Sequence, residues 1–93
     1  MIRSFRCPET RKIHDGSISH CLPGDIQRVM RRKLAYLAAA GDLNDLRVPP
    51  GNRLEALKGD RKGQHSIRIN HQWRLCFVWV NGGVEDVEIV DYH

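Results

Sequence analysis

The sequence has few cysteines and no long apolar stretch. Its three cysteines, Cys7, Cys21 and Cys76, are too scattered for the disulfide framework of a small secreted domain. Arg3 and Arg6 interrupt the only apolar residues near the start of the chain, so we expect no signal peptide. The remaining apolar runs are too short to span a bilayer. We therefore predict a reduced, cytoplasmic protein without a membrane partner.

Sequence patterns typical of metal and nucleotide sites are also missing. Cys7, His14, His20 and Cys21 are loosely grouped, but they form no C-x2-C or H-x3-H pair, so we predict no metal site. The sequence contains neither a G-x-G-x-x-G nor a P-loop pattern, and we expect no cofactor. A chain of 93 residues without internal repeats fits one domain, residues 1–93.

Basic residues are absent from the last part of the chain. Lysine and arginine outnumber aspartate and glutamate by 15 to 11, which gives a formal charge of +4. No Lys or Arg follows Arg74, whereas four acids remain after it: Glu85, Asp86, Glu88 and Asp91. A basic body favours a polyanionic partner, RNA or DNA, or else an acidic protein. The same charge is equally compatible with an ordinary solvated surface.

Two helices are predicted in the first half of the chain. The first begins at Pro8 and ends at Gly16. The second lies between Asp25 and Gly41, and its apolar face follows helical spacing through Ile26, Val29, Met30, Leu34 and Leu37. Its polar residues are expected to lie largely away from that face: Gln27, Arg28, Arg31 and Arg32. This basic face is either a solvated surface or a contact for RNA or a protein partner.

Strands are predicted at 1–6, 65–69, 73–80 and 84–93. The segment 73–80 is apolar on nearly both faces, which is typical of a central strand. The sequence Asn81-Gly82-Gly83 after it indicates a hairpin turn. The order of elements is therefore β-α-α-β-β-β. It predicts an α+β domain in which two N-terminal helices pack on one face of a small twisted sheet.

The last strand ends in three reactive side chains, Asp91, Tyr92 and His93. Side chains two residues apart share a face of a strand. Asp91 and His93 are therefore expected together at the mouth of the sheet, and Tyr92 on the other face with Glu88 and Val90. A histidine beside a carboxylate can transfer protons near neutral pH. A merely polar strand end is the alternative interpretation.

Two further groups of charged residues are candidates for a site. Glu55, Lys58, Asp60, Arg61 and Lys62 gather around Gly59, where cationic side chains can hold phosphates; the alternative is a charged hairpin tip. The other candidate is an arginine in an almost wholly apolar strand, Arg74. Burying an unpaired charge is costly, so this side chain either pairs with an acid of the sheet or meets a phosphate.

Several ordered motifs resemble the HigB-type toxins of the RelE superfamily. They are Pro49-Pro50-Gly51-Asn52-Arg53-Leu54, Leu57-Lys58-Gly59-Asp60-Arg61, Gln72-Trp73-Arg74-Leu75 and Asp91-Tyr92-His93, together with the opening MIRSF. The resemblance covers nearly the whole chain and implies a RelE-like fold. It also implies a ribosome-dependent endoribonuclease that cuts mRNA in the ribosomal A site. The implied partners are a HigA-type helix-turn-helix antitoxin and, through that complex, operator DNA.

The resemblance implies roles for individual residues in metal-independent RNA cleavage. Asp91 and His93 would transfer protons or orient the transfer, and Tyr92 would stack on a nucleotide or join the relay. Lys58 and Arg74 would stabilise the scissile phosphate. The remaining cations would hold ribosomal RNA: Arg61, Lys62, Arg28, Arg31 and Arg32.

Glu55 departs from the family pattern, because some members carry a histidine in this stretch. Either Glu55 is the base and His93 the acid, or the C-terminal trio carries the chemistry, or the activity is weak. Two other functions remain open: a gyrase inhibitor like the ParE branch, and a degenerate toxin that only binds its antitoxin and DNA. Asp91-Tyr92-His93 and Lys58 argue against the first, whereas Glu55 favours the second.

Overall fold

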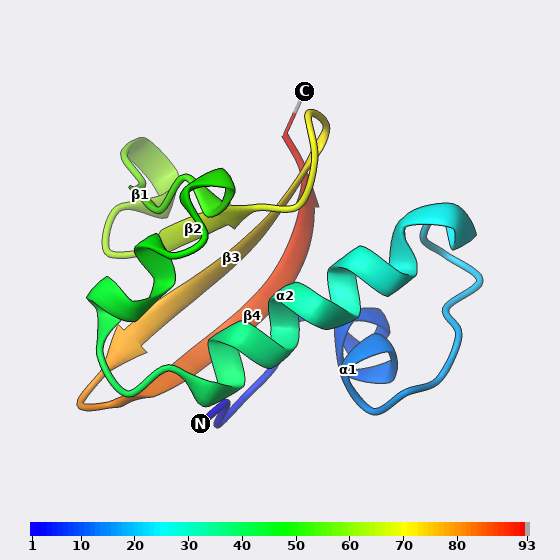
Figure 1. Cartoon of the computed structure of the whole chain (residues 1–93), viewed down its shortest axis with the longest axis horizontal. Coiled ribbons are helices and arrows are strands. Elements are labelled where there is room, and N and C mark those ends of the chain that lie inside the picture. Colours follow the sequence, from blue (N-terminus) through cyan, green and yellow to red (C-terminus); the bar gives the residue numbers. More distant parts are fainter. Residues whose placement is uncertain (93) are drawn as a thin grey trace.

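The computed structural model describes residues 1–92 of the chain. In this range the chain forms two α-helices and a four-stranded antiparallel sheet (Figure 1). The helices are α1 (Pro8–His14) and α2 (Gln27–Ala39), and the strands are β1 (Glu55–Ala56), β2 (His65–Arg68), β3 (Trp73–Val80) and β4 (Gly83–Asp91). The strands neighbour one another in sequence order, so the sheet is a meander. This arrangement confirms the predicted α+β fold.

Both helices pack on the same face of the sheet, where α2 contacts β3 and α1 contacts β4 (Figure 1). Met30, Leu34 and Leu37 of α2 are fully buried, as their spacing predicts. They share one core with Leu75 and Phe77 of β3. Burial of each such side chain contributes roughly 1.5–3 kcal/mol. Neither helix within residues 1–92 is long and apolar enough to cross a membrane.

One polar residue of α2 does not lie where the helical spacing places it. Gln27 is buried, with 5% of its surface exposed. Its amide donates to the carbonyls of Ser19 and Leu22 at 2.8 and 3.0 Å, and its oxygen accepts from the Ser19 amide at 3.1 Å. A polar side chain can be buried when its hydrogen bonds are satisfied in this way. Gln27 therefore fixes the loop that precedes the helix.

The N-terminal segment differs from the predicted strand. Instead of a continuous ladder, Ile2 and Phe5 form two isolated parallel bridges with Val84 and Val87 of β4. Between these bridges the β4 backbone bulges at Asp86, which has a φ of 54°. A bulge of this kind locally disrupts ladder pairing. The sequence also did not single out β1, which is only two residues long.

Buried polar residues hold the segment between α2 and the sheet. Lys33 of α2 is 6% exposed and donates to the side-chain oxygen of Asn52, which is fully buried. The Asn52 amide in turn donates to the carbonyls of Leu46 and Val48 at 3.1 and 3.3 Å. Burial lowers the pKa of the Lys33 ammonium. This contact fixes the backbone that leads directly into Arg53.

The strand register determines which side chains share the face opposite the helices. Arg68 of β2 pairs with Arg74 of β3, and Arg74 pairs with Val90 of β4. Directly paired residues point to the same side of a sheet. The amide of Tyr92 donates to the Gln72 carbonyl at 2.6 Å, so the end of β4 lies against the turn between β2 and β3. These pairings gather arginines and Tyr92 at one end of the open face.

Candidate functional site

Arg74 is the centre of the candidate site. Only 8% of its surface is exposed. Its Nε donates to the Ser66 hydroxyl at 2.7 Å, and its Nη2 donates to the Arg53 carbonyl at 2.8 Å. The ion pairs found within residues 1–92 do not include Arg74. Among the described residues, the groups that hold the guanidinium are therefore neutral oxygens.

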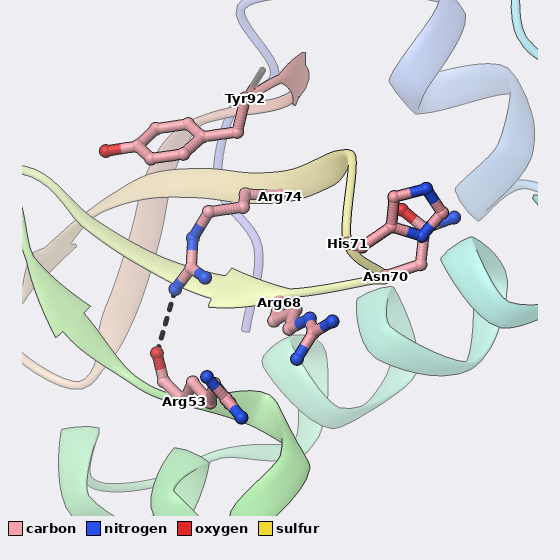
Figure 2. A pocket seen from close by; sticks show the side chains of 6 residues that line it. All are labelled: Arg53, Arg68, Asn70, His71, Arg74 and Tyr92. Atoms are coloured by element: carbon pink, nitrogen blue, oxygen red, sulfur yellow. Dashed lines mark hydrogen bonds between the residues drawn. The ribbon is translucent and has the colours of Figure 1, made fainter.

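Tyr92 lies over Arg74. The Arg74 guanidinium carbon is 5.5 Å from the centre of the tyrosine ring, a geometry that allows cation–π attraction. Figure 2 shows the ring on one side of the guanidinium and the Arg53 carbonyl on the other. The Tyr92 side chain is substantially exposed, so a planar ligand can reach it. The placement agrees with the predicted face for Tyr92, shared with Val90.

Tyr92 lines several hollows. The first has a volume of about 210 Å³ and is lined by Arg53, Arg68, Asn70, His71, Arg74 and Tyr92 (Figure 2). The second has a volume of about 510 Å³ and is lined by Glu55, Ala56, Leu57, Lys58 and Tyr92. A carboxylate and an ammonium group thus line one hollow beside the tyrosine, and several cations line another. This combination can bind phosphates and exchange a proton.

Arg61 lies at a third hollow, of about 430 Å³, with Val90, Asp91 and Tyr92. Its guanidinium donates to Glu88 at 2.8 Å and to the side-chain oxygen of Gln64 at 3.0 Å. The hydrogen bond to Glu88 raises the pKa of Arg61. Arg61 therefore ties the loop after β1 to β4, whereas its neighbour Lys62 is exposed.

Of the three C-terminal residues, Asp91 and Tyr92 belong to the described part of the chain. Asp91 is exposed and accepts a hydrogen bond from the side-chain Nε2 of Gln72 at 3.1 Å. His93, predicted to share its face, lies outside the described residues. Among residues 1–92, no group of three or more His, Cys, Asp or Glu side chains is arranged to hold a metal ion.

The helix arginines are not part of this cluster, because α2 covers the opposite face of the sheet. Arg28 and Arg32 are exposed. Arg31 donates to the carbonyls of Ile13 and Ser17 at 3.0 and 3.2 Å, and it thereby holds the end of α1. These contacts give Arg31 a structural role in addition to the RNA contact expected of it.

Several residues of the site were not singled out from the sequence: Arg53, Ser66, Arg68, Asn70 and His71. The alternation of residues 65–69 already places Ser66 and Arg68 on one face. Their register with Arg74 depends on the turn at Asn70, whose side-chain oxygen accepts from the amides of Gln72 and Trp73 at 2.9 and 2.8 Å. Periodicity could therefore have found Arg68, but not Arg53.

The fold is similar to that of a protein in a solved toxin–antitoxin complex. YoeB in the YoeB–YefM toxin–antitoxin complex from Staphylococcus aureus superposes on the chain with a TM-score of 0.62. The two are 22% identical, and the alignment covers 100% of this chain and 98% of the other. At that identity the likeness establishes the RelE-like fold alone.

The sequence defines the family more narrowly. Residues 4–93 match the family of RelE-like toxins of the type II toxin–antitoxin system HigB, and the chain belongs to this family. Toxin HigB-1 of Vibrio cholerae is 52% identical over 61 residues, which span 66% of this chain and 64% of that protein. Endoribonuclease HigB of Proteus vulgaris is 31% identical in an alignment of length 96 that covers 100% of both chains.

Proposed function

We propose that this toxin is a ribosome-dependent endoribonuclease that cuts translated mRNA and so inhibits translation and growth. The observation that carries the proposal is the position of Tyr92, whose ring centre lies 5.5 Å from the Arg74 guanidinium carbon and which borders the hollow of Glu55 and Lys58. An aromatic ring can hold a nucleotide there, with cations and a carboxylate beside its phosphates. The full-length match to a relative named as an endoribonuclease supports the same activity.

The proposed reaction uses the RNA's own 2′-hydroxyl and no metal ion. The 2′-oxygen attacks the adjacent phosphorus while the bond from phosphorus to the 5′-oxygen breaks. A base takes the 2′-proton, and an acid gives a proton to the departing 5′-oxygen. The products are a 2′,3′-cyclic phosphate and a 5′-hydroxyl. Negative charge accumulates on the phosphoryl oxygens in the transition state. Cations stabilise that charge best when the protein already holds them in place before the reaction.

Arg74 is the fixed cation in this scheme. Its Nε and Nη2 are held by protein oxygens, whereas its Nη1 has no hydrogen-bond partner among residues 1–92. We assign Nη1 to the scissile phosphate and the exposed Lys58 to the same charge. Immobilising one edge of a guanidinium leaves little reorganisation for the reaction itself.

Proton transfer is assigned to residues on both sides of the phosphate. Glu55 is exposed at the second hollow, and we assign it as the base for the 2′-hydroxyl. His93 is the acid and Asp91 orients it, while Tyr92 stacks on the nucleotide. In the alternative assignment, the C-terminal residues carry out both transfers. Arg61, Lys62 and the helix residues Arg28, Arg31 and Arg32 would contact ribosomal RNA.

The proposed partners follow from the toxin–antitoxin family. We infer a HigA-type helix-turn-helix antitoxin that neutralises the toxin in the cytoplasm and represses the shared operon by binding operator DNA. The ribosome and its mRNA are the targets of the free toxin.

Mapping RNA ends after induction tests the activity. Wild-type protein, induced without antitoxin, should produce new 5′-hydroxyl ends within translated messages. His93→Ala and Glu55→Gln should reduce these ends about 10²- to 10⁴-fold, the usual contribution of general acid–base groups. Growth arrest with a DNA-damage response and intact mRNA would instead indicate gyrase inhibition. Unchanged growth on induction would indicate a protein that only binds its partners.

A further inference from the structure

Two arginines face each other across neighbouring strands of the site. Arg68 pairs directly with Arg74 in the β2–β3 register, and both side chains line the first hollow with Arg53. Like charges directly opposite each other destabilise a sheet. Among residues 1–92, the lining of this hollow includes no aspartate or glutamate that would neutralise them. The scissile phosphate assigned to Arg74 would offset one of these charges, and a second anion beside Arg68 would offset the other.

The three arginines differ in how firmly they are held. Arg74 is fixed by Ser66 and by the Arg53 carbonyl. The side chains of Arg53 and Arg68 form no hydrogen bond or ion pair with other residues of the described chain. Arg53 also adopts a left-handed backbone conformation, with φ 46° and ψ 57°, which is uncommon for a residue other than glycine. Its carbonyl bond to Arg74 holds that conformation (Figure 2).

We propose that Arg53 and Arg68 bind a second phosphate of the RNA strand, next to the phosphate that is cut. This inference rests on the proposed nuclease function. The scissile phosphate needs a proton acceptor within reach, and Glu55 lines the second hollow, which Tyr92 also borders. Arg53 and Arg68 line the first hollow, where no described lining residue carries a carboxylate, so we assign these two arginines to holding the RNA strand rather than to cutting it.

The dimensions of the two hollows support a strand that crosses Tyr92. A volume of about 210 Å³ is smaller than the roughly 300–1,000 Å³ of typical small-molecule pockets, yet it has room for a phosphodiester. Since Tyr92 borders both hollows, one base can stack on its ring while the phosphates on either side occupy the two hollows. His71 adds a further polar group at the rim of the first hollow.

Binding of an uncleavable RNA tests the site. A short single-stranded RNA with 2′-O-methyl groups cannot attack its own phosphates, and fluorescence anisotropy gives its Kd at several salt concentrations. Arg53→Gln and Arg68→Gln should each weaken binding about tenfold, the effect expected when a charge-assisted hydrogen bond is removed. The slope of log Kd against log salt should fall by about 0.7 for each phosphate that the variant no longer neutralises. Arg68→Lys should retain most of the salt dependence.

Arg3→Gln is the matched control, because it also removes one positive charge. Arg3 faces Glu85 at the start of β4, roughly 25 Å along the strand from Tyr92 at about 3.3 Å per residue. This variant should bind the RNA as wild type does. The Tm of Arg68→Gln should equal or exceed that of wild type, because the substitution removes a like-charge pair. A purely structural role would lower it.

Cleavage kinetics separate this inference from the proposed function. If wild type cuts mRNA on ribosomes, Arg68→Gln should raise KM about tenfold and leave kcat unchanged, because it removes uniform binding. Unchanged KM, Kd and salt slope in both glutamine variants would overturn the phosphate site while the nuclease proposal stands. Suppose instead that the wild-type protein does not cut RNA, but the glutamine variants lose RNA binding. The phosphate site would then stand, and the nuclease proposal would be overturned. Binding of inorganic phosphate alone, with RNA affinity unaffected by either variant, would also refute the site.

Discussion

Replacing Arg74 by lysine keeps the charge but should markedly destabilise the fold. The guanidinium donates to the Ser66 hydroxyl and to the Arg53 carbonyl at 2.7 and 2.8 Å. A lysine has one terminal nitrogen on a flexible chain, so it cannot reproduce this fork. A hydrogen bond from a charged donor contributes roughly 1.5–3 kcal/mol. We therefore expect the free energy of unfolding to fall by about 2 kcal/mol, and the Tm by roughly 8–16 °C.

Urea and thermal unfolding measure this effect directly. The m-value should stay constant, which shows that the denatured state is unchanged. Arg28→Lys is the control, because Arg28 is exposed on α2; its free energy of unfolding should change by less than about 0.5 kcal/mol. Ser66→Ala combined with Arg74→Lys should be non-additive, since the two side chains share one hydrogen bond. A change below about 0.5 kcal/mol in Arg74→Lys would refute the account of Arg74 as a structural tie.

Other substitutions test other parts of the molecule. Burial lowers the pKa of Lys33, so the unfolded chain binds the lysine proton more tightly than the folded chain does. The free energy of unfolding should therefore rise with pH from the folded pKa up to the unfolded value of about 10. Lys33→Met, measured by urea unfolding between pH 7 and about 10, should lack that rise. Glu88→Gln weakens the ion pair with Arg61 and should cost about 1 kcal/mol in urea unfolding, less in high salt. Tyr92→Phe should retain RNA cleavage if the ring acts by stacking, and Tyr92→Ala should lose it; equal losses would instead implicate the hydroxyl.

Local sequence patterns predicted the elements whose cause is local. Pro8 and Gly16 bracket α1, and the apolar spacing of α2 identified the side chains that fill the core. The N-terminal segment failed as a strand because its partner, β4, bulges at Asp86. The bulge depends on contacts between distant segments, such as the amide of Asp86 donating to the Ser4 hydroxyl at 2.9 Å. Nothing in either segment alone indicates this contact.

The site shows the same division. Period-two counting placed Tyr92 on the face of Val90, and an arginine in an apolar strand was recognised as needing a partner. The identity of that partner could not be predicted, because the Arg53 carbonyl lies 21 residues away and belongs to a residue in a left-handed backbone conformation. The proton-transfer roles of Asp91 and His93 remain predictions, since His93 lies outside the described residues.

Arg74 joins stability to the proposed chemistry. Its hydrogen bonds connect β2, β3 and the segment before β1, and the same side chain supports Tyr92. A loss of cleavage in an Arg74 variant therefore does not by itself establish a catalytic role, because the variant also loosens the surroundings of both hollows. Arg68 lacks these ties. It therefore reports on phosphate binding without altering the scaffold, and comparison of the two arginines separates the cost of folding from the cost of binding RNA.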